Sequence, residues 1–150
     1  MLHGSCLCKT VTYQVEEIVG PYVYCHCISC RKANGSAFAA NVSVPIGAFH
    51  ISSGSDSLSV YESSPGKQRH FCSRCGSPIF TTVGKHPELA RVRLGTLDSD
   101  FSDSPAAHIF VGEKAQWHTM NDGVREYESW PDSEQLKIPG SRQGIESRGP

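Results

Sequence analysis

Seven cysteines in three tight groups are the feature that most constrains this 150-residue chain. The groups are Cys6-x-Cys8, Cys25-x-Cys27-x-x-Cys30 and Cys72-x-x-Cys75. Cysteines one or two residues apart can bring their sulfurs to one ion, as metal sites require. A disulfide framework would need an oxidising compartment and would leave one thiol over. The spacing therefore favours metal binding.

Two partitions of the seven thiols suit zinc, which prefers four tetrahedral ligands. In the first, a closed four-ligand site is made by Cys6, Cys8, Cys72 and Cys75, and an open three-ligand site is made by Cys25, Cys27 and Cys30. The second is an ordinary zinc ribbon made by Cys27, Cys30, Cys72 and Cys75. Spacing alone does not choose between them. We favour the first partition because the second leaves Cys6, Cys8 and Cys25 without a role.

A purely structural pair of zinc ions is the competing interpretation. His26, His3 or His70 would then lie close to the metal or complete the fourth position. On a strand, however, His26 points away from both neighbouring cysteines and is a poor fourth ligand. We expect it to be packed or to support the metal site indirectly.

Hydrophobic residues alternate with polar ones in most runs, which predicts a mainly β class. The expected strands lie within residues 9–16, 36–44, 57–62, 91–94 and 108–111. One short helical turn is expected at 29–35, closed by Gly35, and another at 87–90. These patterns predict compact, zinc-stapled antiparallel β-sheets with short helical turns.

Length and composition limit the domain organisation and the class of function. The chain has the length of one domain, which we place at 1–138, followed by a disordered tail at 139–150. A net charge of −1 gives no reason to expect nucleic acid as a partner. The sequence shows no signal-peptide pattern and no apolar run that would span a membrane. We expect a cytoplasmic protein with reduced thiols.

Four segments together resemble a known family. GSCLC, CHCISCRKANGSAF, FCSRCGSPIF and LGTLD are similar to motifs of the glutathione-dependent formaldehyde-activating enzymes, a family that also includes centromere protein V. The resemblance runs from about Gly4 to Trp117, and it extends toward Trp130. It implies a zinc-stapled β fold.

The resemblance also implies the ligand sets and the reaction. It assigns a structural zinc to Cys6, Cys8, Cys72 and Cys75, and a second, catalytic zinc to Cys25, Cys27 and Cys30. The implied reaction joins formaldehyde to glutathione as S-hydroxymethylglutathione. Two zinc ions per chain are expected, the second with partial occupancy.

Three thiolates around zinc leave one position for an exogenous ligand, which is typical of a catalytic site. Their charge makes the ion a weak Lewis acid that is better suited to a soft thiol than to water. We therefore expect a carbon–sulfur lyase that forms or cleaves a thiol adduct of a small aldehyde. Arg31, Lys32 and Arg69 are candidates to bind the carboxylates of glutathione. The alternative is a non-enzymatic zinc protein that carries a thiol or binds a protein partner.

Overall fold

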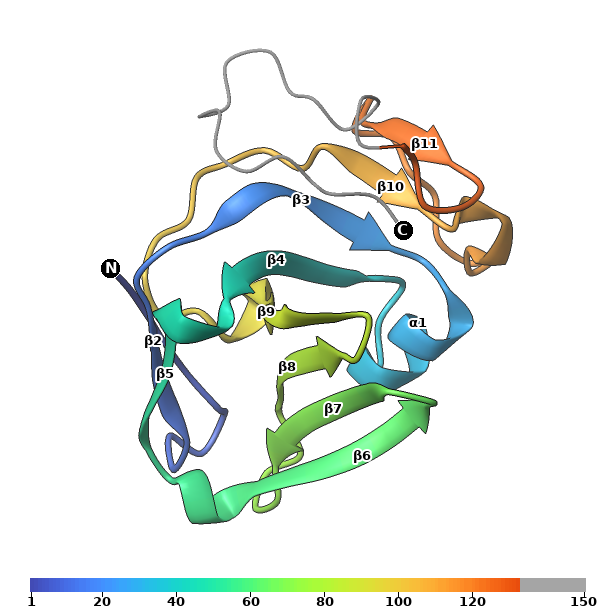
Figure 1. The fold of residues 1–150 in the computed structure, drawn as a ribbon. Helices are drawn as coiled ribbons and strands as arrows, with labels where there is room; N and C mark the ends of the chain where they lie inside the picture. Colours follow the sequence, from blue (N-terminus) through green and yellow to red (C-terminus); the bar gives the residue numbers. More distant parts are fainter. Residues whose placement is uncertain (133–150) are drawn as a thin grey trace. The chain divides into compact units, whose positions relative to one another are not determined.

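The computed structural model describes residues 1–132, and the chain divides into two compact units (Figure 1). The first unit contains residues 1–18 and 42–102, and the second contains residues 19–41 and the segment from residue 103 onward. The predicted tail at 139–150 lies outside the described residues, and the domain boundary at 138 stays a prediction. Among the described residues, no helix is long and apolar enough to cross a membrane.

A three-stranded antiparallel sheet opens the first unit. Its order is β1 (Leu2–Ser5), β2 (Thr12–Val15) and β5 (Phe49–Ser53). The alternation predicted within residues 9–16 is confirmed in β2. Tyr13 and Val15 are buried, whereas Thr12 and Gln14 are only half-buried. The ring of Tyr13 packs against that of Phe49, with centroids 5.4 Å apart.

Four antiparallel strands follow one another in the same unit and pair in chain order (Figure 1). They are β6 (Leu58–Ser64), β7 (Lys67–Cys72), β8 (Pro78–Val83) and β9 (His86–Arg93). Phe80 of β8 packs on Phe49, with ring centroids 4.7 Å apart. This aromatic contact joins the four-stranded meander to the three-stranded sheet. Short 3-10 turns occupy Ile46–Ala48, Ser55–Ser57 and Leu94–Thr96.

Gly54 precedes one of these turns and has a left-handed φ of 72°. A Cβ atom there would collide with the carbonyl oxygen of Thr10. We expect Gly54→Ala to lower the free energy of unfolding by about 3 kcal/mol, because backbone strain adds to overpacking. Gly20→Ala is the matched control, since its φ is 69° and nothing lies within 4 Å of the new methyl group. Urea denaturation should separate the variants, and equal losses would refute the packing argument.

The second unit contains parallel strand pairs, which local patterning did not predict. β10 (Ala107–Ile109) pairs in parallel with both β3 (Val19–Cys25) and β11 (Arg125–Tyr127). The register places Cys25 opposite Ile109. The mainly β class is confirmed, but its sheets are mixed rather than wholly antiparallel. β4 (Ala39–Pro45) runs from this unit into the first.

The helical turn predicted at 29–35 is confirmed as α1 (Ile28–Asn34). Gly35 ends it in a left-handed conformation, with its amide donating to the Arg31 carbonyl. At the start of the helix, Cys27 is the N-cap residue and its sulfur accepts from the Cys30 amide at 3.4 Å. The helix therefore begins inside the cysteine group.

The second predicted helical turn, Pro87–Ala90, is wrong because these residues lie in β9. Thr82 of β8 pairs with Ala90, whereas the next residue, Val83, pairs with His86. The shift in register leaves Pro87 outside the positions that pair with β8, which is where a strand tolerates a residue without an amide proton. A proline that suggested a helix start is thus accommodated in an irregular strand.

Candidate metal centres

The first cysteine cluster joins two turns of the first unit. Cys6 and Cys8 lie on the turn after β1, where Lys9 has a positive φ of 59°. Cys72 ends β7, and Cys75 lies in the following turn. The next residue, Gly76, has a left-handed φ of 77°, and its amide donates to the Cys72 carbonyl at 2.8 Å, which closes the turn.

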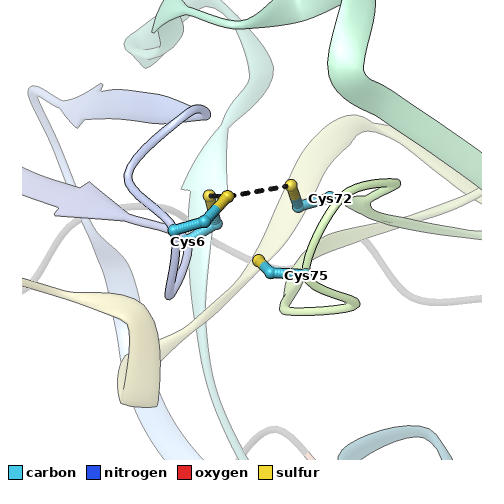
Figure 2. A group of neighbouring side chains, drawn as sticks. Cys6, Cys72 and Cys75 are labelled. Atoms are coloured by element: carbon cyan, nitrogen blue, oxygen red, sulfur yellow. Dashed lines mark hydrogen bonds between the residues drawn. The ribbon is translucent and has the colours of Figure 1, made fainter.

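The four sulfurs of this cluster all lie within 4.8 Å of one another. Cys6 Sγ is 3.5 Å from Cys8 Sγ, which is 3.8 Å from Cys72 Sγ. Figure 2 shows the side chains of Cys6, Cys72 and Cys75 converging from separate segments. Zinc–sulfur bonds of about 2.3 Å give a tetrahedron with edges of about 3.8 Å. The cluster therefore fits a zinc ion without a large rearrangement.

Hydrogen bonds also hold the two turns together. The Leu7 amide donates to the Ser77 hydroxyl at 2.9 Å, and Arg74 donates to the Thr10 hydroxyl at 3.1 Å. The Ser77 hydroxyl lies 3.3 Å from Cys75 Sγ, and its contact lowers the pKa of that thiol to about 5. A thiolate, which is the form that binds a metal, is thus favoured at Cys75.

The second cluster lies where β3 meets α1 in the second unit. Cys25 ends the strand, Cys27 caps the helix and Cys30 lies in its first turn. Cys25 Sγ and Cys27 Sγ are 3.5 Å apart, and all three sulfurs lie within 4.8 Å. The neighbouring thiols and then burial raise the pKa of Cys25, as expected when several sulfurs share one site without a cation. The geometry suits three ligands of one soft metal ion.

His26 is completely buried, and no histidine or carboxylate joins either cysteine cluster among residues 1–132. Its Nε2 atom lies 2.7 Å from Nδ1 of His108, and Nε2 of His108 lies 3.0 Å from a carboxylate oxygen of Asp122. Burial, followed by the charges of His108, His118 and Lys114, lowers the pKa of His26 to about 4. The prediction that His26 is packed rather than a ligand agrees with this arrangement.

The other predicted contact residues lie in different places. Arg31 and Lys32 are on α1, the former half-buried and the latter exposed. Arg69 is a buried residue of β7 in the first unit, where its Nε donates to the Ser63 hydroxyl at 2.9 Å. Their roles in binding a substrate stay predictions.

The two remaining histidines also lie in the first unit. His70 stacks on Phe80 at 4.0 Å, and burial lowers its pKa. His3 lies in β1, where its amide donates to the Ser99 hydroxyl at 2.8 Å. Neither belongs to a potential metal-binding group among the described residues.

Sequence reasoning did not identify three residues near the second cluster, which is called the cysteine trio from here on. These residues are His108, Glu113 and Asp122. Glu113 accepts a hydrogen bond from the Ile28 amide at 2.7 Å, across 85 positions of sequence. The carboxylate of Asp122 has a pKa below its usual range, because the Val124 amide and then His108 bind it. A strand was predicted at residues 108–111, of which 108 and 109 lie in β10, but no local signal connected them to residues 26–28.

A family model described as glutathione-dependent formaldehyde-activating enzyme matches residues 1–113, which contain every residue of both cysteine clusters. The chain belongs to this family. The structure groups its cysteines as four and three, which is the first of the two partitions. In this formaldehyde-activating enzyme family member, both groups are compatible with metal binding.

Relatives of the chain carry the same family name. A Halomonas elongata protein named "Putative glutathione-dependent formaldehyde-activating enzyme" is 31% identical over 160 aligned positions, covering 97% of this chain and 98% of that protein. A Phaeosphaeria nodorum protein of the same name is 34% identical, covering 82% and 70%. The crystal structure of a Rhodobacter sphaeroides protein has a TM-score of 0.59 at 21% identity, covering 67% of this chain and 92% of that one. That last similarity concerns the fold alone.

Proposed function

We propose that this protein is a zinc-dependent carbon–sulfur lyase that forms or cleaves the adduct of a thiol with a small aldehyde. Glutathione and formaldehyde are the proposed pair, because the family model and the named relatives carry both words. Zinc is proposed at both cysteine clusters. The reduced thiols that this requires are consistent with a cytoplasmic location.

The observation that supports this proposal most strongly is the ligand count at the second cluster. Cys25, Cys27 and Cys30 lie within reach of one ion, and no other side-chain ligand in residues 1–132 joins them. A zinc ion held by three protein ligands keeps one position for an external molecule. When bound there, zinc would lower the pKa of a thiol at the open position and so supply a thiolate at neutral pH.

The overall reaction is balanced without a redox partner. The thiol sulfur forms a bond to the carbonyl carbon of the aldehyde, the carbon–oxygen π bond becomes a hydroxyl group, and the thiol proton ends on that oxygen. Cleavage reverses each change. Cys25, Cys27 and Cys30 would hold the ion to which the reacting thiol binds, and they need not form a covalent intermediate.

Arg31 is the side chain we propose to orient glutathione, through one of its carboxylates. It follows Cys30 directly on α1, and its Nε atom is buried with no hydrogen-bond partner among the described residues. A carboxylate oxygen of a bound ligand could accept a hydrogen bond from this buried N–H group and so satisfy it. Lys32 and Arg69 remain proposed contacts for the second carboxylate.

Thiol binding can be tested with the cobalt-substituted protein. We expect glutathione to change the visible spectrum, because a fourth sulfur alters the ligand field, whereas S-methylglutathione should change it much less. Cys30→Ser serves as the control and should abolish the response. A spectrum that is indifferent to thiols, with a protein side chain as fourth ligand, would instead favour a structural or partner-binding zinc protein.

A further inference from the structure

The backbone on both sides of Cys27 is fastened to residues 108–122. On one side, the His26 amide donates to the Ile109 carbonyl at 2.9 Å, an extension of the β3–β10 pairing. On the other side, the Ile28 amide donates to the carboxylate of Glu113 at 2.7 Å. The central ligand of the trio is thus held between two anchors.

The backbone conformation after β10 accounts for the second anchor. Phe110 adopts a left-handed φ of 57°, which is uncommon for a residue other than glycine. A 3-10 turn, Val111–Glu113, follows directly and carries the anchoring carboxylate at its end. Non-glycine residues in this conformation concentrate at functional sites, where surrounding contacts hold them.

A chain of hydrogen bonds fixes the side chain of His26 as well. The two carboxylate oxygens of Asp122 lie 3.2 and 3.0 Å from Nε2 of His108, and the Val124 amide holds one of them at 3.1 Å. An ionised carboxylate only accepts hydrogen bonds, so Nε2 of His108 carries a proton. On the other side of the same ring, Nδ1 of His108 lies 2.7 Å from Nε2 of His26, so the two rings share a hydrogen bond.

The ring of His26 is completely buried, and its centroid lies 5.4 Å from that of Phe38 and 4.9 Å from that of His108. Its backbone joins Cys25 to Cys27 directly, so the orientation of the ring is linked to the placement of two ligands of the trio. Asp122 ends the hydrogen-bonded chain that holds this ring in place.

We propose that Asp122 is a positioning residue for the cysteine trio: through His108 it holds the orientation of His26 and, together with the Glu113 anchor, the placement of Cys27. The inference rests on the proposed metal-binding role of the trio. It concerns a residue beyond the segment 1–113 that the family model matches. A site with three protein ligands gains most from such support, because no fourth ligand restrains its sulfurs.

The first test is the environment of the His26 ring in the full-length protein, followed by the ¹H–¹⁵N NMR signals of its imidazole nitrogens. Asp122→Ala should shift these signals, because His108 loses the carboxylate that fixes its ring against His26. Glu126→Gln is the control, because it removes one exposed carboxylate on β11 and should leave the signals unchanged.

The second test measures cobalt binding to the trio, after one equivalent of zinc has been added to the full chain to fill the closed site. The signal is assigned by its absence in Cys30→Ser. Asp122→Ala should weaken this binding by about tenfold, as is typical for residues that orient a metal site. Glu113→Ala should also weaken it, but without shifting the NMR signals of the His26 ring.

The inference is overturned if Asp122→Ala leaves either the NMR signals of the His26 ring or the cobalt affinity unchanged, including the case in which only the melting temperature falls. A lyase assay on the unsubstituted protein is recorded separately. Absence of turnover there, with the NMR and cobalt results as expected, would reject the proposed reaction and keep the positioning role.

Discussion

Replacing Cys75 by serine should lower the melting temperature by about 10 °C and remove the metal from the four-cysteine site. The ligands come from turns 64 residues apart in sequence, measured from Cys8 to Cys72. In the chain-entropy model, a cross-link that closes a loop of this length stabilises a protein by about 4 kcal/mol. For a chain of this size, each kcal/mol shifts the midpoint by about 2–4 °C. Metal content and calorimetry of the same sample measure both effects.

Ser73→Ala is the matched control for Cys75→Ser. Ser73 is an exposed residue of the same turn and offers no thiol, so its replacement should leave metal content and melting unchanged. The hydrogen bonds from Leu7 and Arg74 persist in both variants and should not rescue the loss of the ion. Full metal content together with unchanged melting of Cys75→Ser would show that this cluster is not a structural metal site.

Replacing Cys30 by serine should have the opposite profile: activity and one metal equivalent are lost while the fold survives. Cys30 is buried, so exchanging its sulfur for a hydroxyl still costs about 1–2 kcal/mol, or roughly 4 °C. The four-cysteine cluster belongs to the other unit and keeps all its ligands. The metal content should therefore fall to one ion per chain, whatever the occupancy of the second site in the unsubstituted protein.

The comparison of the two serine variants discriminates between the interpretations of the trio. If Cys30→Ser unfolds as completely as Cys75→Ser, the trio holds a structural ion and the lyase proposal loses its basis. If it keeps both activity and metal, another residue provides the missing ligand. A selective loss of one ion and of turnover is the result that we expect.

Local sequence features predicted the cysteine groups and part of the structure that carries them. Spacing indicated that the thiols of each group can reach one ion, and Gly35 indicated the end of a short helix; the structure shows two groups of converging sulfurs and confirms the helix end. Cys6 and Cys8 lie on a turn rather than in a strand. A Cys-x-Cys pair can converge in either conformation, so its spacing predicted the grouping without its local structure.

Long-range pairing could not be predicted in the same way. Periodicity reports which face of a strand is buried, but it does not report which strand lies beside it. The parallel pairing of β3 with β10 joins segments more than 80 residues apart, and the contact of His26 with His108 depends on it. Asp122 and Glu113 were missed for this reason, because single acidic residues on loops carry no pattern that identifies their partners.

The unequal sequence separations within the two clusters have a consequence for the order of events during synthesis. The trio spans residues 25–30, so all three thiols leave the ribosome nearly together. Cys6 and Cys8 emerge first, yet their partners follow only at residues 72 and 75. Because closing the longer loop also costs more entropy, the nascent chain offers a local three-thiol ligand well before it offers the four-cysteine one. During that interval Cys6 and Cys8 have no complete metal site. These two thiols, although synthesised first, are therefore exposed to oxidation for the longest time.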